Sequence, residues 1–342
     1  MSSHKISLRN IKPQNECPCG SRLAITKENF PMLHGMALYQ LKLEAGCYRE
    51  PHWHPNADEL GYCLSGKVLI TIFSHGNQHD CFTIEPGEMF FVPSGSIHTI
   101  ENIGEGCAEF ILSFSHERPE DFGLSGAVGC MSLDVMGNTF EKKSSHLGLL
   151  TRSEDDCFFG KSEGVLSLPD TASFPNRLKF SIENISPGIN ADYGFAKLAR
   201  HETWPALRSQ AMYSLTVHGT GMREPHWHPE TAELGYVLAG KARMTVKSPN
   251  QVAETYSLEP GDAYFIPRAY PHHIENLTNE KLRFLIFFDT PHVQDIGYTG
   301  AIPAFPNRII APTLKIDPTL IPQIPTDRLI VKKINHELSR HN

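Results

Sequence analysis

Two sets of three histidines and one glutamate recur in this 342-residue sequence at a constant offset of 174 residues. The first set is His52, His54, Glu59 and His98, and the second is His226, His228, Glu233 and His272. Three imidazoles and one carboxylate form a ligand set for first-row divalent metal ions. On an octahedral ion they leave about two coordination positions open, and open positions are typical of catalytic sites. The sequence therefore predicts two metal centres of catalytic type.

Glycines and prolines around the ligands recur at the same offset. The first copy reads Gly46-x5-His52-Trp-His54-x4-Glu59-x6-Gly66, followed by Gly87-x5-Pro93-x-Gly95-x2-His98-x3-Asn102. The second copy differs at two turn positions, where Thr220 replaces Gly46 and Ala269 replaces Gly95, and it keeps every ligand. One such histidine would most often be an ordinary core or surface group. Four ligand types in the same order, twice, favour one metal site in each copy.

Short strands and tight turns must bring these ligands together. His52 and His54 are two residues apart, so on a strand their side chains project from the same face. The turn residues 55–58 let the next strand return with Glu59, and Pro93 and Gly95 predict a tight turn before His98. Similar short apolar segments recur between Gly, Pro and Asn along both copies. This pattern predicts an all-β fold dominated by two tandem closed antiparallel or jelly-roll barrels, with short helical extensions after each.

The repeat also divides the chain into five parts. We expect a polar leader at 1–20, a first barrel at 21–130, a partly helical connector at 131–195, a second barrel at 196–302 and a C-terminal extension at 303–342. The segment after each barrel would suit contacts between subunits, so we expect a homo-oligomer.

The composition is that of an ordinary soluble globular protein, with 40% hydrophobic and 20% charged residues. A net charge of −7 gives no reason to expect nucleic acid or an anionic membrane as a partner. No apolar run approaches the ~20 residues that span a bilayer, and residues 1–15 show no secretory signal. All eight cysteines lie in the first 157 residues, without counterparts in the second copy, so we expect reduced thiols in a cytoplasmic protein. Cys17-Pro-Cys19 is interpreted as an incidental surface motif rather than a metal or redox pair.

The two signatures resemble the two motifs of the cupin family, and their duplication resembles a bicupin. The stretches 49–59, 223–229 and 241–246 are similar to the oxalate decarboxylase group of bicupins. This resemblance implies one manganese ion in each barrel, bound by three histidines and one glutamate. It also implies cleavage of oxalate to formate and carbon dioxide, with dioxygen required but not consumed. We therefore expect a small carboxylate such as oxalate as the substrate. Ligand chemistry alone also permits Fe(II) or another divalent metal.

Arg49 and Arg223 precede the first histidine of each set by three residues. A guanidinium directed into the site would polarise a bound carboxylate and stabilise negative charge. Alternatively, the two arginines are surface groups that pair with Glu50 and Glu224. Because the arginine recurs where the signature begins, we favour the site role.

Proton transfer in the resembled family depends on a glutamate in a flexible lid of the first barrel. The equivalent stretch here, 114–122, is about three residues shorter and lacks the family's Ser-Glu-Asn-Ser pattern. Glu117 and Glu120 are candidate proton carriers, although solvated loop carboxylates are an equally good interpretation. The altered lid keeps other reactions open: oxalate oxidation, dioxygenation, isomerisation of a sugar, or metal binding and storage without turnover.

Overall fold

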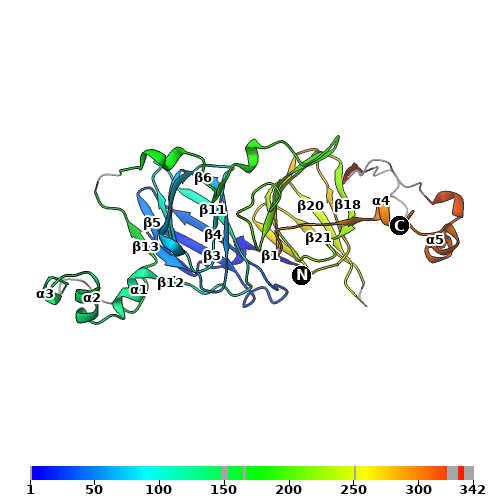
Figure 1. Cartoon of the computed structure of the whole chain (residues 1–342). Helices are drawn as coiled ribbons and strands as arrows, with labels where there is room; N and C mark the ends of the chain where they lie inside the picture. The colour runs from blue at the N-terminus through cyan, green and yellow to red at the C-terminus, as the bar shows by residue number, and fades with distance from the viewer. Residues whose placement is uncertain (1, 148–152, 165–166, 250–251, 322–329, 335–342) are drawn as a thin grey trace. The chain divides into compact units, whose positions relative to one another are not determined.

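The chain forms two compact units, each of them a barrel of two facing antiparallel sheets (Figure 1). The structure is a computed structural model and describes residues 2–147, 153–164, 167–249, 252–321 and 330–334. The N-terminal unit comprises Ile11–Asn29 and Gly35–Ser181, and the C-terminal unit comprises Met1–Asn10, Phe30–His34 and Ile182–Asn342. The prediction of two tandem jelly-roll barrels in a mostly β protein is confirmed.

The N-terminal unit contains one seven-stranded and one six-stranded sheet. The first has the order β14 (Lys179–Phe180), β9 (Met89–Val92), β6 (Glu59–Ser65), β11 (Ala108–Phe114), β4 (Ala37–Leu43), β3 (Gly20–Ile25) and β2 (Asn15–Cys17). The second has the order β12 (Phe122–Gly123), β5 (Cys47–Trp53), β10 (Ile97–Asn102), β7 (Val68–Ser74) and β8 (Gln78–Ile84), and β13 (Phe159–Lys161) also pairs with β5.

The C-terminal unit repeats this arrangement. Its seven-stranded sheet has the order β1 (Lys5–Ser7), β22 (Asp262–Ile266), β19 (Glu233–Ala239), β24 (Leu282–Phe288), β17 (Ala211–Val217), β16 (Gly194–Ala199) and β15 (Ile189–Ala191). Its six-stranded sheet has the order β21 (Glu254–Leu258), β20 (Ala242–Val246), β23 (His272–Asn276), β18 (Gly221–Trp227) and β25 (Ile296–Gly297), and β26 (Val331–Lys333) also pairs with β18.

Alternation along the strands decides which side chains point inward. In β10, residues His98, Ile100 and Asn102 are buried while their neighbours are half-buried, as expected for successive side chains on opposite faces of a strand. Fully buried phenylalanines, among them Phe82 and Phe110, fill the space between the sheets. The ligands therefore project into a packed barrel interior.

Each barrel includes one short edge strand that lies, in the sequence, just before the other barrel. β1 pairs with β22 in the C-terminal unit, and β14 pairs with β9 in the N-terminal unit. The Lys5 ammonium lies 2.7 Å from the Asp262 carboxylate, and Lys179 lies 2.8 Å from Glu88 in the same way. Sequence reasoning assigned no strand to residues 1–20.

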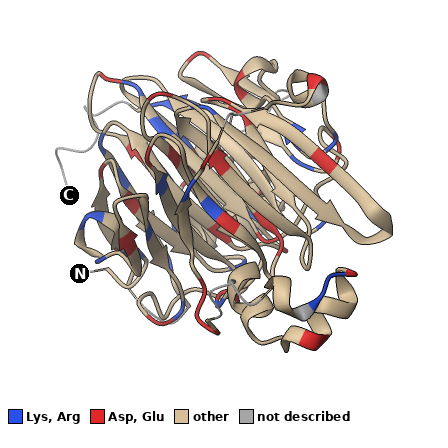
Figure 2. Cartoon of the chain, turned by 90° about the vertical axis from the view of Figure 1, so that its left-hand side faces the viewer, with Lys and Arg blue, Asp and Glu red and all other residues tan. Residues whose placement is uncertain are grey.

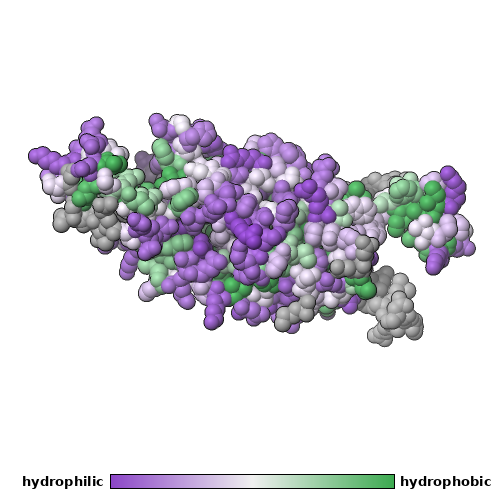
Figure 3. Space-filling model, turned by 90° about the horizontal axis from the view of Figure 1, so that it is seen from below, coloured by the Kyte–Doolittle hydropathy of each residue, from purple (hydrophilic) through white to green (hydrophobic). Residues whose placement is uncertain are grey.

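Short helices follow each barrel. They are α1 (Leu124–Gly129), α2 (Leu133–Thr139) and α3 (Ser144–Leu147) after the first barrel, and α4 (Tyr298–Ala301) and α5 (Asn307–Leu314) after the second. Hydrophobic side chains gather on the extension that carries α5 (Figure 3), where Phe305, Ile309 and Leu314 are 55%, 48% and 44% exposed. Acidic and basic residues are interspersed on the face shown in Figure 2. Among the described helices, none is long and apolar enough to cross a bilayer.

Candidate metal centres

The N-terminal barrel brings the first predicted ligand set together between its two sheets. The ligand atoms of His52, His54, Glu59 and His98 all lie within 4.8 Å of one another, and all four residues are buried. His52 and His98 are direct partners across β5 and β10, with a bulge just after His98. Glu59 enters from the facing sheet as the first residue of β6. The carboxylate thus meets the imidazoles from the opposite side of the barrel.

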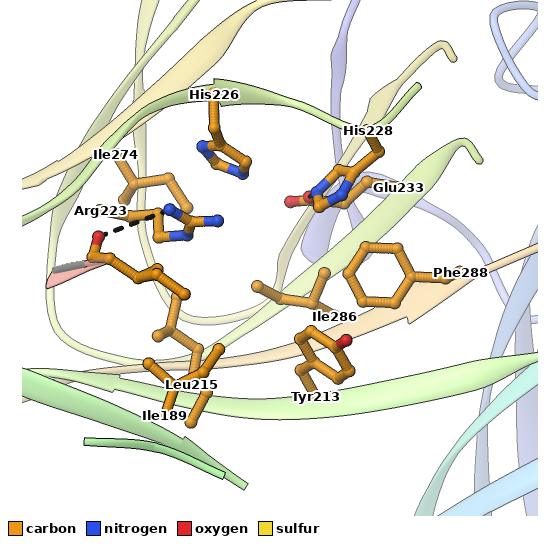
Figure 4. Close-up of a pocket in the computed structure, with 12 residues that line it drawn as sticks. Ile189, Tyr213, Leu215, Arg223, His226, His228, Glu233, Ile274, Ile286 and Phe288 are labelled. Atoms are coloured by element: carbon orange, nitrogen blue, oxygen red, sulfur yellow. Dashed lines mark hydrogen bonds and ion pairs between the residues drawn. The ribbon is translucent and has the colours of Figure 1, made fainter. Parts of the chain in front are cut away.

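The C-terminal barrel reproduces this geometry. His226, His228, Glu233 and His272 again have all their ligand atoms within 4.8 Å of one another. His226 and His272 are partners across β18 and β23, and Glu233 begins β19. Figure 4 shows His226, His228 and Glu233 on the wall of one cavity, which Arg223 also lines.

The backbone orients the imidazoles of both sets. The Nδ1 atoms of His52 and His54 lie 2.8 Å from the carbonyl oxygens of Glu50 and Glu120. His226 and His228 use the carbonyls of Glu224 and Gln294 at 2.7 and 2.9 Å. A carbonyl only accepts, so Nδ1 is the donor in each contact, which is the usual arrangement of a metal-binding histidine. Nε2 of His54 and Nε2 of His228 lie 3.1 and 3.0 Å from Oε2 of the glutamate of their set. The third histidines, His98 and His272, make equivalent contacts at 3.2 and 2.9 Å.

Burial adjusts the protonation of both sets toward metal binding. Burial and the nearby Arg49 guanidinium hold the pKa of His52 well below its ordinary value, and the same causes act on His226 with Arg223. Burial alone would raise the pKa of Glu59, but the imidazoles of His98 and His54 outweigh it and lower the pKa to about 2. Neutral imidazoles and an ionised carboxylate are the forms in which these groups bind metals.

The second oxygen of the glutamate differs between the two sets. In the C-terminal set the Tyr264 hydroxyl donates to Oε1 of Glu233 at 2.5 Å. The equivalent residue of the N-terminal set is Phe90, and Oε1 of Glu59 is buried without a hydrogen-bond partner among the described residues. A buried carboxylate oxygen without a donor is costly unless a cation is present.

Together, the donor sets fit a divalent metal ion. Each offers three imidazole nitrogens and one ionised carboxylate, with all four ligand atoms within 4.8 Å of one another. The partnerless Oε1 of Glu59 is a further sign that a cation belongs in the N-terminal set.

Arg49 and Arg223 both line the cavities beside their ligand sets. The Arg49 side chain is 3% exposed and its Nη2 donates to both carboxylate oxygens of Asp121 at 2.7 Å. Arg223 donates to Asp295 at 2.6 Å and to the Ile330 carbonyl, the dashed line in Figure 4. Glu50 is only a secondary partner, 3.8 Å from Arg49.

The candidate proton carriers Glu117 and Glu120 lie in the loop that follows β11. The Glu117 carboxylate accepts a hydrogen bond from the Gly35 backbone N–H at 2.8 Å. Glu120 is exposed, and its carbonyl oxygen holds His54. Neither belongs to the described residues that line the N-terminal cavity. The loop's contribution to the His54 orientation is through its backbone.

Three residues of the N-terminal site were not predicted from the sequence as site residues. Asp121 and Arg22 line the cavity, and the Phe158 ring lies under Arg49 with the guanidinium carbon 3.7 Å from the ring centroid. Asp121 had one available signal, its repetition as Asp295 at the 174-residue offset. Arg22 and Phe158 had none, because they come from β3 and from the segment before β13.

Comparison with known proteins gives a consistent result. The cupin family model matches residues 6–146 and 180–321. Oxalate decarboxylase OxdC of Bacillus subtilis is 28% identical over 294 residues, which cover 84% of this chain and 75% of that protein. A solved structure of oxalate decarboxylase from the same organism has a TM-score of 0.87 at 24% identity and covers 98% of this chain and 88% of its own. Another, with a TM-score of 0.86 at 24% identity over 98% of this chain and 90% of its own, is described as having Mn(II) centres.

Proposed function

This chain belongs to the cupin family and contains two cupin domains, and on that premise we propose that it is a manganese-dependent enzyme that decarboxylates oxalate. The observation that carries the proposal is the pairing, in each barrel, of a buried three-histidine, one-glutamate set with a buried arginine in the same cavity. The similarity to oxalate decarboxylases over most of the chain supports the substrate.

The residues of the N-terminal site would have different roles in this reaction. His52, His54, Glu59 and His98 would hold the metal ion, and the second set would hold another. A bound manganese ion would supply the Lewis-acid and redox chemistry, with dioxygen as the required co-reactant. Arg49 would bind and polarise a substrate carboxylate, since its guanidinium is buried and always charged. Asp121 positions Arg49, as Asp295 positions Arg223.

The test is to produce the chain with manganese, measure the metal content per chain, and supply oxalate with and without dioxygen. Formate and carbon dioxide, formed only with dioxygen, are the expected products. Arg49→Lys and Arg223→Lys form a matched pair that shows which barrel turns substrate over. If metal is bound and oxalate stays unchanged, the proposal is wrong.

The proton carrier is examined separately with Glu117→Gln and Glu120→Gln. We expect one of them to lose formate production while it keeps its metal content. Asp121→Asn is the comparison, because Asp121 is a carboxylate that lines the cavity.

Oxalate oxidation is the second candidate function. It is favoured by the position of the Glu117 carboxylate, which binds the Gly35 N–H and does not line the N-terminal cavity among the described residues. The same assay distinguishes the two reactions, because oxidation yields hydrogen peroxide without formate.

We further propose that the chain forms homo-oligomers through the extension that carries α5, where Phe305, Ile309 and Leu314 are exposed. All eight cysteines are free thiols, which supports a cytoplasmic location. Analytical ultracentrifugation of the purified chain tests the assembly, and a monomer at micromolar concentration would contradict it.

A further inference from the structure

The two cavities are built from equivalent residues except along one wall. Tyr39 and Tyr213, and likewise Arg49 and Arg223, occupy the same places in the two barrels. On the first long strand of each barrel, however, Arg22 lines the N-terminal cavity and Ala196 lines the other. Their backbone positions match, since Arg22 pairs with Leu41 and Ala196 with Leu215. At this position, therefore, the two walls differ in the side chain and not in the backbone.

Arg22 belongs to a charged cluster in the N-terminal cavity. Its Nη1 donates to Asp121 at 3.0 Å, and Arg49 donates to the same carboxylate at 2.7 Å. The guanidinium carbons of Arg22 and Arg49 lie 4.5 and 3.7 Å from the Phe158 ring centroid. One carboxylate thus serves two guanidinium groups, held over one aromatic ring.

Arg22 retains unused hydrogen-bonding capacity. Its side chain is 16% exposed, and its Nε is buried without a hydrogen-bond partner among the described residues. A guanidinium carries five N–H donors in a planar fork that matches a carboxylate. A buried donor of this kind is expected to have an acceptor when the site is complete.

The C-terminal cavity presents a different surface at the same place. Ala196, Ile189 and Ile330 line it, and Figure 4 shows Ile189 and Leu215 facing the cavity opposite the histidines. Its arginine, Arg223, already has the Asp295 carboxylate as a partner at 2.6 Å. Among the described lining residues, that cavity has one arginine and the N-terminal cavity has two.

We propose that Arg22 determines the specificity of the N-terminal site by binding the second carboxylate of a dianionic substrate, while Arg49 and the metal centre take the first. The C-terminal site, which has Ala196 instead, discriminates little between dianions and monoanions. This inference rests on the proposed function, because it places a small carboxylate at the N-terminal metal centre.

The test is equilibrium binding to the manganese-loaded full chain without dioxygen, so that no turnover occurs. A His226→Ala background removes one proposed ligand from the C-terminal site. Calorimetric titrations use oxalate and malonate as dianions and formate and acetate as monoanions. Arg22→Ala is expected to weaken dianion binding by about 10- to 100-fold, the range for losing a charge-assisted hydrogen bond. Monoanion binding should change by less than about threefold.

Arg22→Lys and Arg22→Met separate specificity from structure. Lysine keeps the charge and should retain part of the preference for dianions, whereas methionine keeps much of the packing against Phe158 and should lose it. Equal weakening of dianions and monoanions would overturn the proposal, because it would mean that Arg22 only holds Asp121 and Arg49 in place. Unchanged dianion binding in all three variants would also overturn it.

Failure of the proposed function gives a different result. If the wild-type chain binds malonate or another dianion in an Arg22-dependent way but leaves oxalate unchanged in the turnover assay, Arg22 keeps its role and oxalate decarboxylation is rejected. If oxalate is decarboxylated and Arg22→Ala binds it as tightly as the wild type does, the function stands and the role of Arg22 is rejected.

Discussion

Tyr264 and Phe90 give the two metal centres different hydrogen bonding. The Tyr264 hydroxyl donates to Oε1 of Glu233, and in the other barrel Phe90 leaves the same oxygen of Glu59 without a partner among the described residues. Tyr264→Phe removes the donor from a fully buried carboxylate, so we expect the metal-free C-terminal unit to lose about 1–3 kcal/mol of unfolding free energy. Urea denaturation measures the loss. Phe90→Tyr is the matched variant and should leave the C-terminal unit unchanged. Equal stability of Tyr264→Phe and the wild type would show that the hydrogen bond contributes nothing.

The buried histidines predict a pH dependence of the metal-free protein. His52 and His226 have pKa values well below the ordinary 6.5 because of burial and the adjacent arginines. Below pH 6.5 the unfolded chain binds protons that the folded chain does not, so stability falls as the pH falls. The slope is about 1.4 kcal/mol per pH unit for each histidine, down to its folded pKa. Glu59, with a pKa of about 2 against an ordinary 4.5, contributes stability that is lost only between those two values.

Urea denaturation at pH 7.5, 6.5 and 5.5 measures this dependence. His52→Gln serves as the control, because it removes one titrating group and should reduce the slope of the N-terminal unit alone. A stability that stays constant from pH 6.5 to 5.5 would mean that the folded protein protonates these histidines.

The turn before the third histidine shows how an element tolerates an unfavourable residue. Gly95 has a φ of +76°, and its replacement Ala269 keeps a φ of +63°. Both N–H groups donate at 2.9 Å to the carbonyl of the second histidine, His54 or His228. Left-handed backbone costs a residue with a Cβ about 1–2 kcal/mol, and the greater freedom of unfolded glycine offsets part of that.

We therefore expect Ala269→Gly to raise the unfolding free energy of the C-terminal unit by roughly 0.5–1 kcal/mol. Gly95→Ala should lower that of the N-terminal unit by a similar amount, since a Cβ there meets nothing within 4 Å and only backbone strain is added. Scanning calorimetry of both variants measures the shifts. Destabilisation by Ala269→Gly would show that the alanine methyl group makes a contact worth more than the strain.

At the scale of the whole molecule, the first ten residues should matter most to the unit that comes last in the sequence. Asp262 is fully buried, and Lys5 and Arg9 lie 2.7 and 2.6 Å from its carboxylate. Replacing both cations with methionine leaves a buried charge without its ion pairs, which costs about 3–5 kcal/mol. The loss should appear in the C-terminal unit only.

Calorimetry that resolves two transitions measures this effect. Lys179→Met is the matched control, because it acts on the half-buried Glu88 of the N-terminal unit. If both transitions shift to lower temperature in the variant with Lys5→Met and Arg9→Met, the two units do not unfold separately, and the prediction is wrong.

The features of this protein that depend on short-range spacing could be predicted from its sequence. Strand alternation and the two tight turns order the ligands of each set within about 50 residues, and the 174-residue repeat doubles them. The short apolar segments of both copies are found as strands, among them β11 and β24. The barrel architecture and the grouping of each four-residue set followed from these local patterns.

The residues that surround the ligands depend on long-range contacts and could not be predicted from the sequence. Asp121 reaches Arg49 across 72 residues, Phe158 reaches it across 109, and Arg22 enters the cavity from another sheet. The N-terminal arm joins the C-terminal unit through strand pairing with β22. Such contacts depend on which sheet faces pack together and which edges remain open for pairing, and these are properties of the folded barrel that residue spacing does not encode.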